Sequence, residues 1–92
     1  MRLGVFHQAA AEPGRSHAHR YTEMIDLIAV AHEMGFDGGG LAELHFGGAF
    51  SLLAQPLMAV PAIAARTRRL RIGTAVSPLP LRHPLELGGQ AA

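Results

Sequence analysis

Apolar residues in this chain fall into short runs separated by polar segments rich in glycine and proline. Residues 2–7 form a β-branched and aromatic run that predicts a strand, and the apolar run at 41–43 predicts a second. Three glycines at 38–40 precede the second run and predict a weakly held start, because glycine offers no side chain to pack. Large or β-branched residues alternate with small or charged ones in residues 70–76, which predicts a third strand.

The segments between these strands have the pattern of amphipathic helices. In the first segment, apolar residues recur at three- and four-residue spacing: Met24, Leu27, Ile28, Ala31 and Met34. Ser16 is the predicted N-cap of this helix, and Gly35 is the left-handed residue that ends it. Residues 56–66 predict a second helix, which either kinks at Pro61 or begins there, because an interior proline removes a hydrogen bond. Residues 85–92 predict the first turns of a third helix.

This alternation of strands and helices predicts an α/β fold with a parallel sheet and right-handed crossovers. The chain has 92 residues, of which 49% are hydrophobic and 16% charged, a balance that argues against disorder. It has no cysteine, which excludes disulfides and thiolate chemistry. The longest apolar stretch, residues 52–65, is shorter than the roughly 20 residues of a membrane span. No signal peptide is recognisable, so the cytoplasm is the predicted location.

All eight basic residues are arginine, and four of them crowd together: Arg66, Arg68, Arg69 and Arg71. Such a cluster could contact nucleic acid. The run is short and lacks interleaved aromatic residues, which favours a solvated turn between a helix and a strand. We therefore predict no nucleic-acid partner.

Polar side chains follow each predicted strand, where parallel α/β proteins gather their reacting groups. These residues are His7 and Gln8, Glu43 and His45, and Thr74 and Ser77. Glu43 ends an apolar strand, where burial favours its neutral form unless a cation or amide donors hold it. Two interpretations of Glu43 remain open: an acid, base or hydrogen-bond anchor for a bound ring, or a tether for the neighbouring loop. His45 could carry protons, although a satisfied core histidine is the commoner case. His17 and His19 lack further ligand spacing, and no metal site is predicted.

Three sequence blocks share a pattern with a known enzyme family. Gly35, Phe36 and Asp37 precede L-A-E-L-H-F at residues 41–46, where that family has a G-F-D turn and then E-H-H-F. Residues 65–76 match the block A-R-T-x-R-[IL]-x-[IL]-G-T-A-V, and residues 79–84 match L-P-L-x-H-P. In these blocks the chain resembles the luciferase-like family of flavin-dependent monooxygenases.

The resemblance implies a (β/α)8 TIM-type barrel, which takes about 250 residues. Residues 1–92 would form one partial domain, the N-terminal three β/α units of that incomplete barrel. The implied reaction uses reduced flavin (FMN) and oxygen on a small organic substrate. Glu43 and His45 would be catalytic. Thr74, Ala75 and Val76 would lie against the flavin, with a non-prolyl cis peptide between Ala75 and Val76.

Departures from the family pattern leave alternatives open. Leu44 replaces the histidine most associated with catalysis, and it cannot transfer a proton. Gly40 replaces an aromatic residue, and the late loops that commonly bind phosphate in such barrels are absent. One alternative is a noncatalytic remnant that acts only by packing on another chain. The other is a deazaflavin-dependent reductase of the same superfamily. A homo-oligomer is a candidate assembly for the chain.

Overall fold

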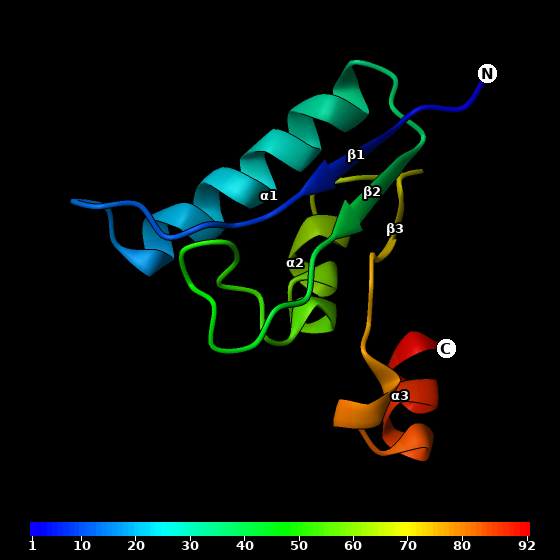
Figure 1. Cartoon of the computed structure of the whole chain (residues 1–92). Helices are drawn as coiled ribbons and strands as arrows, with labels where there is room; N and C mark the ends of the chain where they lie inside the picture. Colours follow the sequence, from blue (N-terminus) through cyan, green and yellow to red (C-terminus); the bar gives the residue numbers. More distant parts are fainter.

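The computed structural model describes all 92 residues and contains a small parallel sheet with helices on one side (Figure 1). The strands β1 (Gly4–His7), β2 (Gly38–Leu41) and β3 (Arg71–Thr74) lie in the order β1-β2-β3 and are all parallel. Helices α1 (His17–Glu33) and α2 (Val60–Ala64) connect them and contribute side chains to one core. This order without reversal is that of a barrel arc and differs from a doubly wound sheet. The chain thus contains three β/α units of an incomplete barrel.

The third unit ends in a helix that stands apart from the other two. After β3, the 3₁₀ helix η2 (Leu79–Leu81) leads into α3 (Pro84–Ala91), which lies below the sheet in Figure 1. Nδ1 of His83 accepts a hydrogen bond from the amide of Leu85 at 3.3 Å and caps α3. None of the helices is both long enough and apolar enough to cross a membrane.

The two faces of the sheet differ in composition. Val5 and Ile72 flank Gly39 in one row of the sheet, and both pack against the core under the helices. The opposite face is made by the alternate rows, Gly4, Gly38 and Arg71, then Phe6, Gly40 and Gly73. Four of these six residues are glycine, so much of this open face is bare backbone.

The core lies between the sheet and the first two helices. Its fully buried residues are Ala9, Met24, Ile28, Leu41, Leu53 and Ile63. The predicted apolar stripe of α1 is correct for Met24, Ile28 and Ala31 and wrong for Leu27 and Met34, which are exposed. The sheet has only three strands and covers one flank of α1, so the flank that carries Leu27 and Met34 has nothing packed on it.

Both predicted ends of α1 are confirmed. The hydroxyl of Ser16 accepts a hydrogen bond from the amide of His19 at 3.1 Å. At the other end, Gly35 has φ +97°, and the amide of Phe36 donates to the carbonyl of Ala31 at 3.0 Å. This 6→1 bond is that of a Schellman motif. The helix therefore begins and ends where its local sequence indicates.

The predicted position of the second strand is wrong. The strand is formed by the three glycines and Leu41, and Glu43 lies beyond its end. Asp37 fixes the strand start, because its amide donates to the carbonyl of Leu3 at 2.7 Å and its carbonyl accepts from Arg71 at 3.1 Å. With pairing on both sides, β2 tolerates glycine. A Cβ on Gly40 would also meet Cβ of Ala75 at 3.4 Å, at the near limit of ordinary van der Waals contact.

The second predicted helix is split in two. Pro56–Met58 form the 3₁₀ helix η1, and α2 begins at Val60, with Pro61 in its first turn. The prediction of one helix over residues 56–66 is therefore wrong, whereas the alternative that the helix begins at Pro61 is confirmed to within one residue, and Pro61 causes no kink. A proline in the first turn gives up no hydrogen bond, because the amide at that position has no partner in the helix.

Replacing Pro61 by alanine is expected to lower the free energy of unfolding by about 0.4–1 kcal/mol. Pro61 already has the backbone conformation of the first turn, so its main effect is to restrict the unfolded chain. Thermal melts followed by circular dichroism measure the difference. A higher midpoint for Pro61→Ala would place this residue in a strained helix interior instead.

Candidate active site

A buried carboxylate organises the carboxyl end of the sheet. The Glu43 side chain is 0% exposed and lies just beyond β2. Its Oε2 accepts a hydrogen bond from the hydroxyl of Ser77 at 2.7 Å. Its Oε1 is 2.9 Å from both Nε2 of His45 and Nη2 of Arg82, and 3.3 Å from Nε of Arg82. Both oxygens are thus engaged by donors from the loops after β2 and β3.

The cation in this cluster is Arg82, which sequence reasoning missed. Its side chain is 7% exposed, and its Nη1 donates to Oε1 of Gln55 at 2.6 Å. Nη2 also donates to the carbonyl of Ala54 at 3.3 Å. Arg82 occupies the variable position of the L-P-L-x-H-P block, so the motif gave no signal. One signal was available in the sequence. A buried Glu43 needs a nearby cation, and Arg82 is the sole charged side chain in the loop after β3.

The environment of Glu43 acts on its pKa in two directions. Burial raises the pKa of the carboxyl group. Hydrogen bonds from His45, Ser77 and Arg82, with the charge of Arg82, outweigh burial and lower the pKa below its ordinary value. Glu43 is therefore held ionised. A buried carboxylate was expected to need a cation or hydrogen-bond donors to stay charged, and Arg82 supplies the cation.

The other predicted site residues divide into two groups. His45 lies in the Glu43 cluster, and its side chain is 26% exposed. His7 forms no side-chain bond with that cluster, and burial followed by the charge of Arg20 lowers its pKa, although Glu23 opposes this. Hydrogen bonds of Leu52 to Ala9 and of Ala11 to Gly48 join the β1–α1 loop to the β2–α2 loop. The loops after β1 and β2 therefore form one rim.

Thr74 ends β3, and Ala75 and Val76 follow it in the segment that leads to Ser77 of this cluster. The amide of Ala75 donates to the carbonyl of Leu41 at 2.8 Å, which fixes the exit of β3. The peptide bond between Ala75 and Val76 is cis, as the resemblance implies. Ala75 adjoins Gly40 on the open face, and Val76 is 75% exposed. These residues present a small apolar surface next to the polar cluster.

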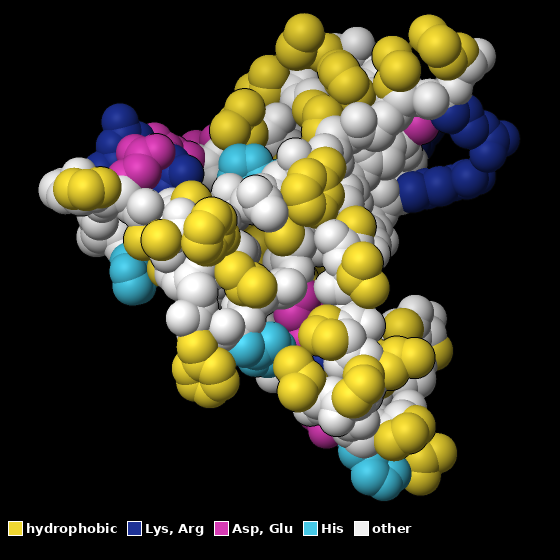
Figure 2. Space-filling model, in the orientation of Figure 1, with side chains coloured by type: hydrophobic (Ala, Val, Ile, Leu, Met, Phe, Trp, Pro, Cys, Tyr) yellow, Lys and Arg dark blue, Asp and Glu magenta, His cyan; other side chains and the backbone are white.

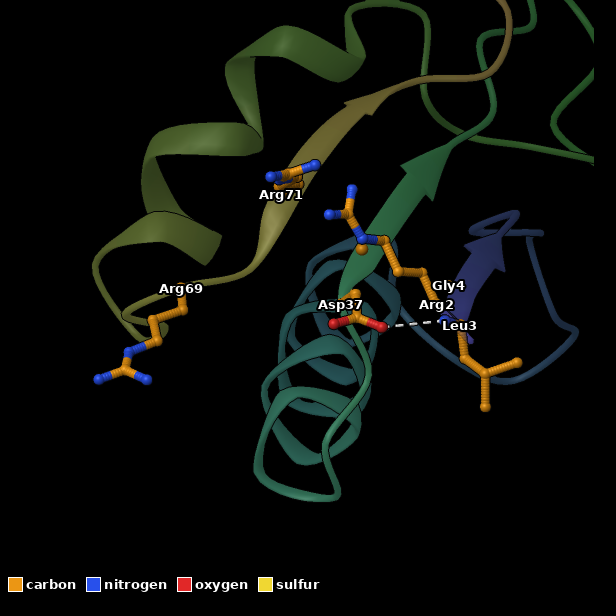
Figure 3. A pocket seen from close by; sticks show the side chains of 7 residues that line it. Arg2, Leu3, Gly4, Asp37, Arg69 and Arg71 are labelled. Atoms are coloured by element: carbon orange, nitrogen blue, oxygen red, sulfur yellow. Dashed lines mark hydrogen bonds between the residues drawn. The ribbon is translucent and has the colours of Figure 1, made fainter.

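The arginines singled out in the sequence lie elsewhere and do not form one surface. Arg66 pairs with Asp26 of α1. Arg2, Arg69 and Arg71 line a hollow of about 380 Å³ at the amino ends of the strands, but the Arg69 side chain points away from it (Figure 3). Asp37 lies at the centre of this hollow and accepts a hydrogen bond from the amide of Leu3 at 3.0 Å. No three His, Asp or Glu side chains lie close enough together to hold a metal ion.

Comparisons with known proteins identify the family. The family model described as luciferase-like monooxygenase matches residues 1–92. The chain belongs to the luciferase-like monooxygenase family. It is 29% identical over 93 residues to the oxygenase component of the flavin-dependent trigonelline monooxygenase of Acinetobacter baylyi, covering 100% of this chain and 26% of the relative.

Solved structures give the same assignment. The monooxygenase RslO1 from Streptomyces bottropensis superposes with a TM-score of 0.90 at 29% identity, over 100% of this chain and 28% of RslO1. The oxygenating constituent of 3,6-diketocamphane monooxygenase from Pseudomonas putida, solved in complex with FMN, has a TM-score of 0.88 at 22% identity, over 98% of this chain and 24% of its own. The second likeness shows the fold alone. The luciferase-like chain thus spans about a quarter of the length of these relatives.

Proposed function

We propose that the chain supplies part of the cofactor cleft of a flavin-dependent monooxygenase that uses reduced FMN and oxygen on a small organic substrate. The observation that carries this proposal is the pairing of two surfaces at one end of the sheet. One is the polar cluster of Glu43 and His45, and the other is the bare surface around Gly40, Ala75 and Val76. Flavin dependence of the trigonelline monooxygenase and the FMN complex of the diketocamphane enzyme support the choice of cofactor.

The open face fits a flat aromatic ring. A Cβ on Gly73 would meet nothing within 4 Å, and one on Gly40 would project toward Ala75 and the Phe6 ring. Side chains at these two positions would occupy the surface on which a planar group can lie. Cofactor pockets are typically apolar with a few placed polar groups. Here the apolar surface consists largely of glycine backbone with Phe6, Ala75 and Val76 beside it, and the Glu43 cluster supplies the polar groups.

The chain's own residues would orient and shield the cofactor. When bound, reduced flavin supplies the reaction with oxygen. Ala75 and Val76 would contact the ring and exclude water from one side of it, and Thr74 would fix their position from the end of β3. Nε2 of His45 is engaged by Glu43, so Nδ1 is the atom free to accept or hold a proton at the site.

A noncatalytic role is a second candidate, favoured by a different observation. Large apolar side chains are exposed on α1, on the open face and on the loop after β2, among them Phe6, Leu27, Met34, Phe46 and Val76. Figure 2 shows hydrophobic side chains spread over the visible surface from α1 to the C-terminal region. Such surfaces are typical of segments that pack against another chain or another part of a larger protein.

The deciding experiment replaces the matching quarter of RslO1 with residues 1–92. FMN binding is followed by fluorescence quenching, and oxidation of reduced FMN by oxygen is followed by absorbance. Binding with oxygen-dependent turnover supports the monooxygenase. Binding of a deazaflavin with hydride transfer in the absence of oxygen would identify the reductase of the same superfamily. A folded chimera that binds neither cofactor would support the noncatalytic role, in which the chain only packs against another chain.

Val76→Asp is expected to weaken FMN binding by the chimera at least about tenfold, because a desolvated carboxylate against the ring costs more than a lost methyl contact. Val30→Asp is the matched control, since Val30 is also exposed but lies on α1, away from the open face. FMN affinity should be unchanged in the control. An equal loss of FMN affinity in the two variants would mean that Val76 does not contact the cofactor.

A further inference from the structure

The Glu43 cluster contains a division of roles that the sequence did not reveal. The Glu43 side chain has no exposed surface, and four donor–acceptor contacts occupy its two oxygens. A carboxylate with no exposed surface and no unoccupied oxygen cannot readily exchange a proton with a bound molecule. His45 is partly exposed and uses only one ring nitrogen. The sequence grouped Glu43 and His45 as catalytic, but only His45 has exposed surface with which to contact a ligand.

We propose that Arg82 is a positioning residue of this site, which holds the Glu43 carboxylate against Nε2 of His45 so that the imidazole presents Nδ1 to the bound molecule. Arg82 reaches Glu43 through Nε and Nη2 and is itself held through Nη1 by Gln55. The guanidinium is planar with fixed donor directions, so two anchors determine the place of the carboxylate. A lysine at this position would supply charge without that geometry.

The orientation of His45 follows from the carboxylate. An ionised carboxylate only accepts hydrogen bonds, so a neutral imidazole beside it carries its proton on Nε2 and leaves Nδ1 as an acceptor. Arg82 and Glu43 are 39 residues apart, and Gln55 lies at the far end of the connection after β2 that also carries Glu43. One side chain thus sets the geometry of the loops after β2 and β3 relative to each other. The role toward a ligand rests on the proposed function, but the arrangement itself can be tested without flavin.

The decisive measurement is the protonation pattern of the His45 ring in the 92-residue chain. Histidine is labelled with ¹⁵N, His45 is assigned by difference, and spectra are recorded by magic-angle spinning, which tolerates self-association. At alkaline pH the wild-type ring should show one tautomer, with the proton on Nε2. In Arg82→Met the ratio of the two tautomers should shift toward Nδ1–H by at least about tenfold, the ratio expected from loss of a held charged acceptor. Arg82→Lys should restore the ratio only in part.

The control and the rescue variant separate positioning from general destabilisation. Arg66→Met removes another arginine ion pair, with Asp26, and should leave the His45 tautomer unchanged. Arg82→Met could unfold the chain by leaving Glu43 buried and unpaired. The double variant Glu43→Gln/Arg82→Met has no such charge and should still show mixed tautomers, because an amide can donate as well as accept. A single Nε2–H tautomer in a folded double variant, or an equal shift in Arg66→Met, would overturn the proposal.

The titration of Glu43, read from its ¹³C carboxyl signal, gives a second readout. In wild type the folded pKa lies below that of the unfolded chain, so Glu43 stabilises the fold above the unfolded pKa, and this contribution is lost as the pH falls through the lower folded value. Arg82→Met keeps the burial but loses the cation, so the Glu43 pKa should rise and acid unfolding should begin at higher pH. An unchanged Glu43 titration in folded Arg82→Met would contradict the role of Arg82.

Discussion

Leu44→His is expected to raise turnover by about 10² to 10⁴ in the chimera that carries residues 1–92 in place of the matching quarter of RslO1, the range typical of a general acid or base. The family pattern has a histidine at this position, and leucine can neither transfer a proton nor donate a hydrogen bond. The backbone is already fixed there, because the amide of Leu44 donates to the carbonyl of Leu53 at 3.0 Å. The side chain is partly exposed, so an imidazole can be accommodated.

An imidazole at position 44 would add a second proton carrier beside His45. Nε2 of His45 is bound to Glu43, and only Nδ1 remains for a ligand. The matched control is Leu27→His, since Leu27 is exposed on α1 at a distance from the site and should leave turnover unchanged. The rate is measured with FMN binding as a parallel readout, so that lost affinity is not taken for lost chemistry. If Leu44→His bound FMN normally and showed no gain, the histidine role of the family would not transfer to this chain.

The parts of the fold that sequence predicted are those with local causes. Ser16 and Gly35 mark the two ends of α1. These ends could be predicted because helix capping depends on a few neighbouring residues and not on what packs against the helix. The parallel pairing of the strands followed from the βαβ alternation, and their order followed from the resemblance to a barrel family. The same reasoning placed Glu43, Thr74 and Ser77 at the carboxyl end of the sheet.

The parts that sequence missed depend on contacts between distant segments. Glycine has a low strand propensity, yet residues 38–40 form β2 because β1 and β3 pair with it on both sides. Arg82 and Glu43 are in contact although they are 39 residues apart, and no local sequence pattern predicts that contact. Leu27 and Met34 have the same helical spacing as Met24, yet they are exposed. Spacing predicts which residues share a face of the helix, but it does not predict how much of that face the rest of the fold covers.

The chain made alone is expected to self-associate and to show no saturable flavin binding in the micromolar range. β1 and β3 each pair only with β2, so both sheet edges carry unpaired backbone groups, which are templates for pairing with other chains. The open face adds Phe6 and Val76, and the outer flank of α1 adds Leu27 and Met34, all exposed. A soluble monomer rarely leaves so much apolar surface uncovered.

Flavin should bind weakly for a related reason. Ligand sites typically bury roughly 70–90% of the surface of a small molecule. This chain offers one face of a sheet and one cluster of side chains, so a bound ring would remain open to water on its other side. The rest of a family barrel would cover that side, which is why the chimera and the isolated chain should differ sharply in FMN affinity.

Light scattering measures the association state, and flavin fluorescence quenching measures binding. The variant Leu27→Lys/Met34→Lys separates the two causes of association, because it places charge on the α1 flank and leaves the strand edges intact. Reduced association in this variant would assign the contact to the helix, and unchanged association would assign it to the sheet edges. A monodisperse wild-type monomer that binds flavin with micromolar affinity would contradict the prediction, since three strands and one buried arginine pair would then be enough to build a working cofactor site.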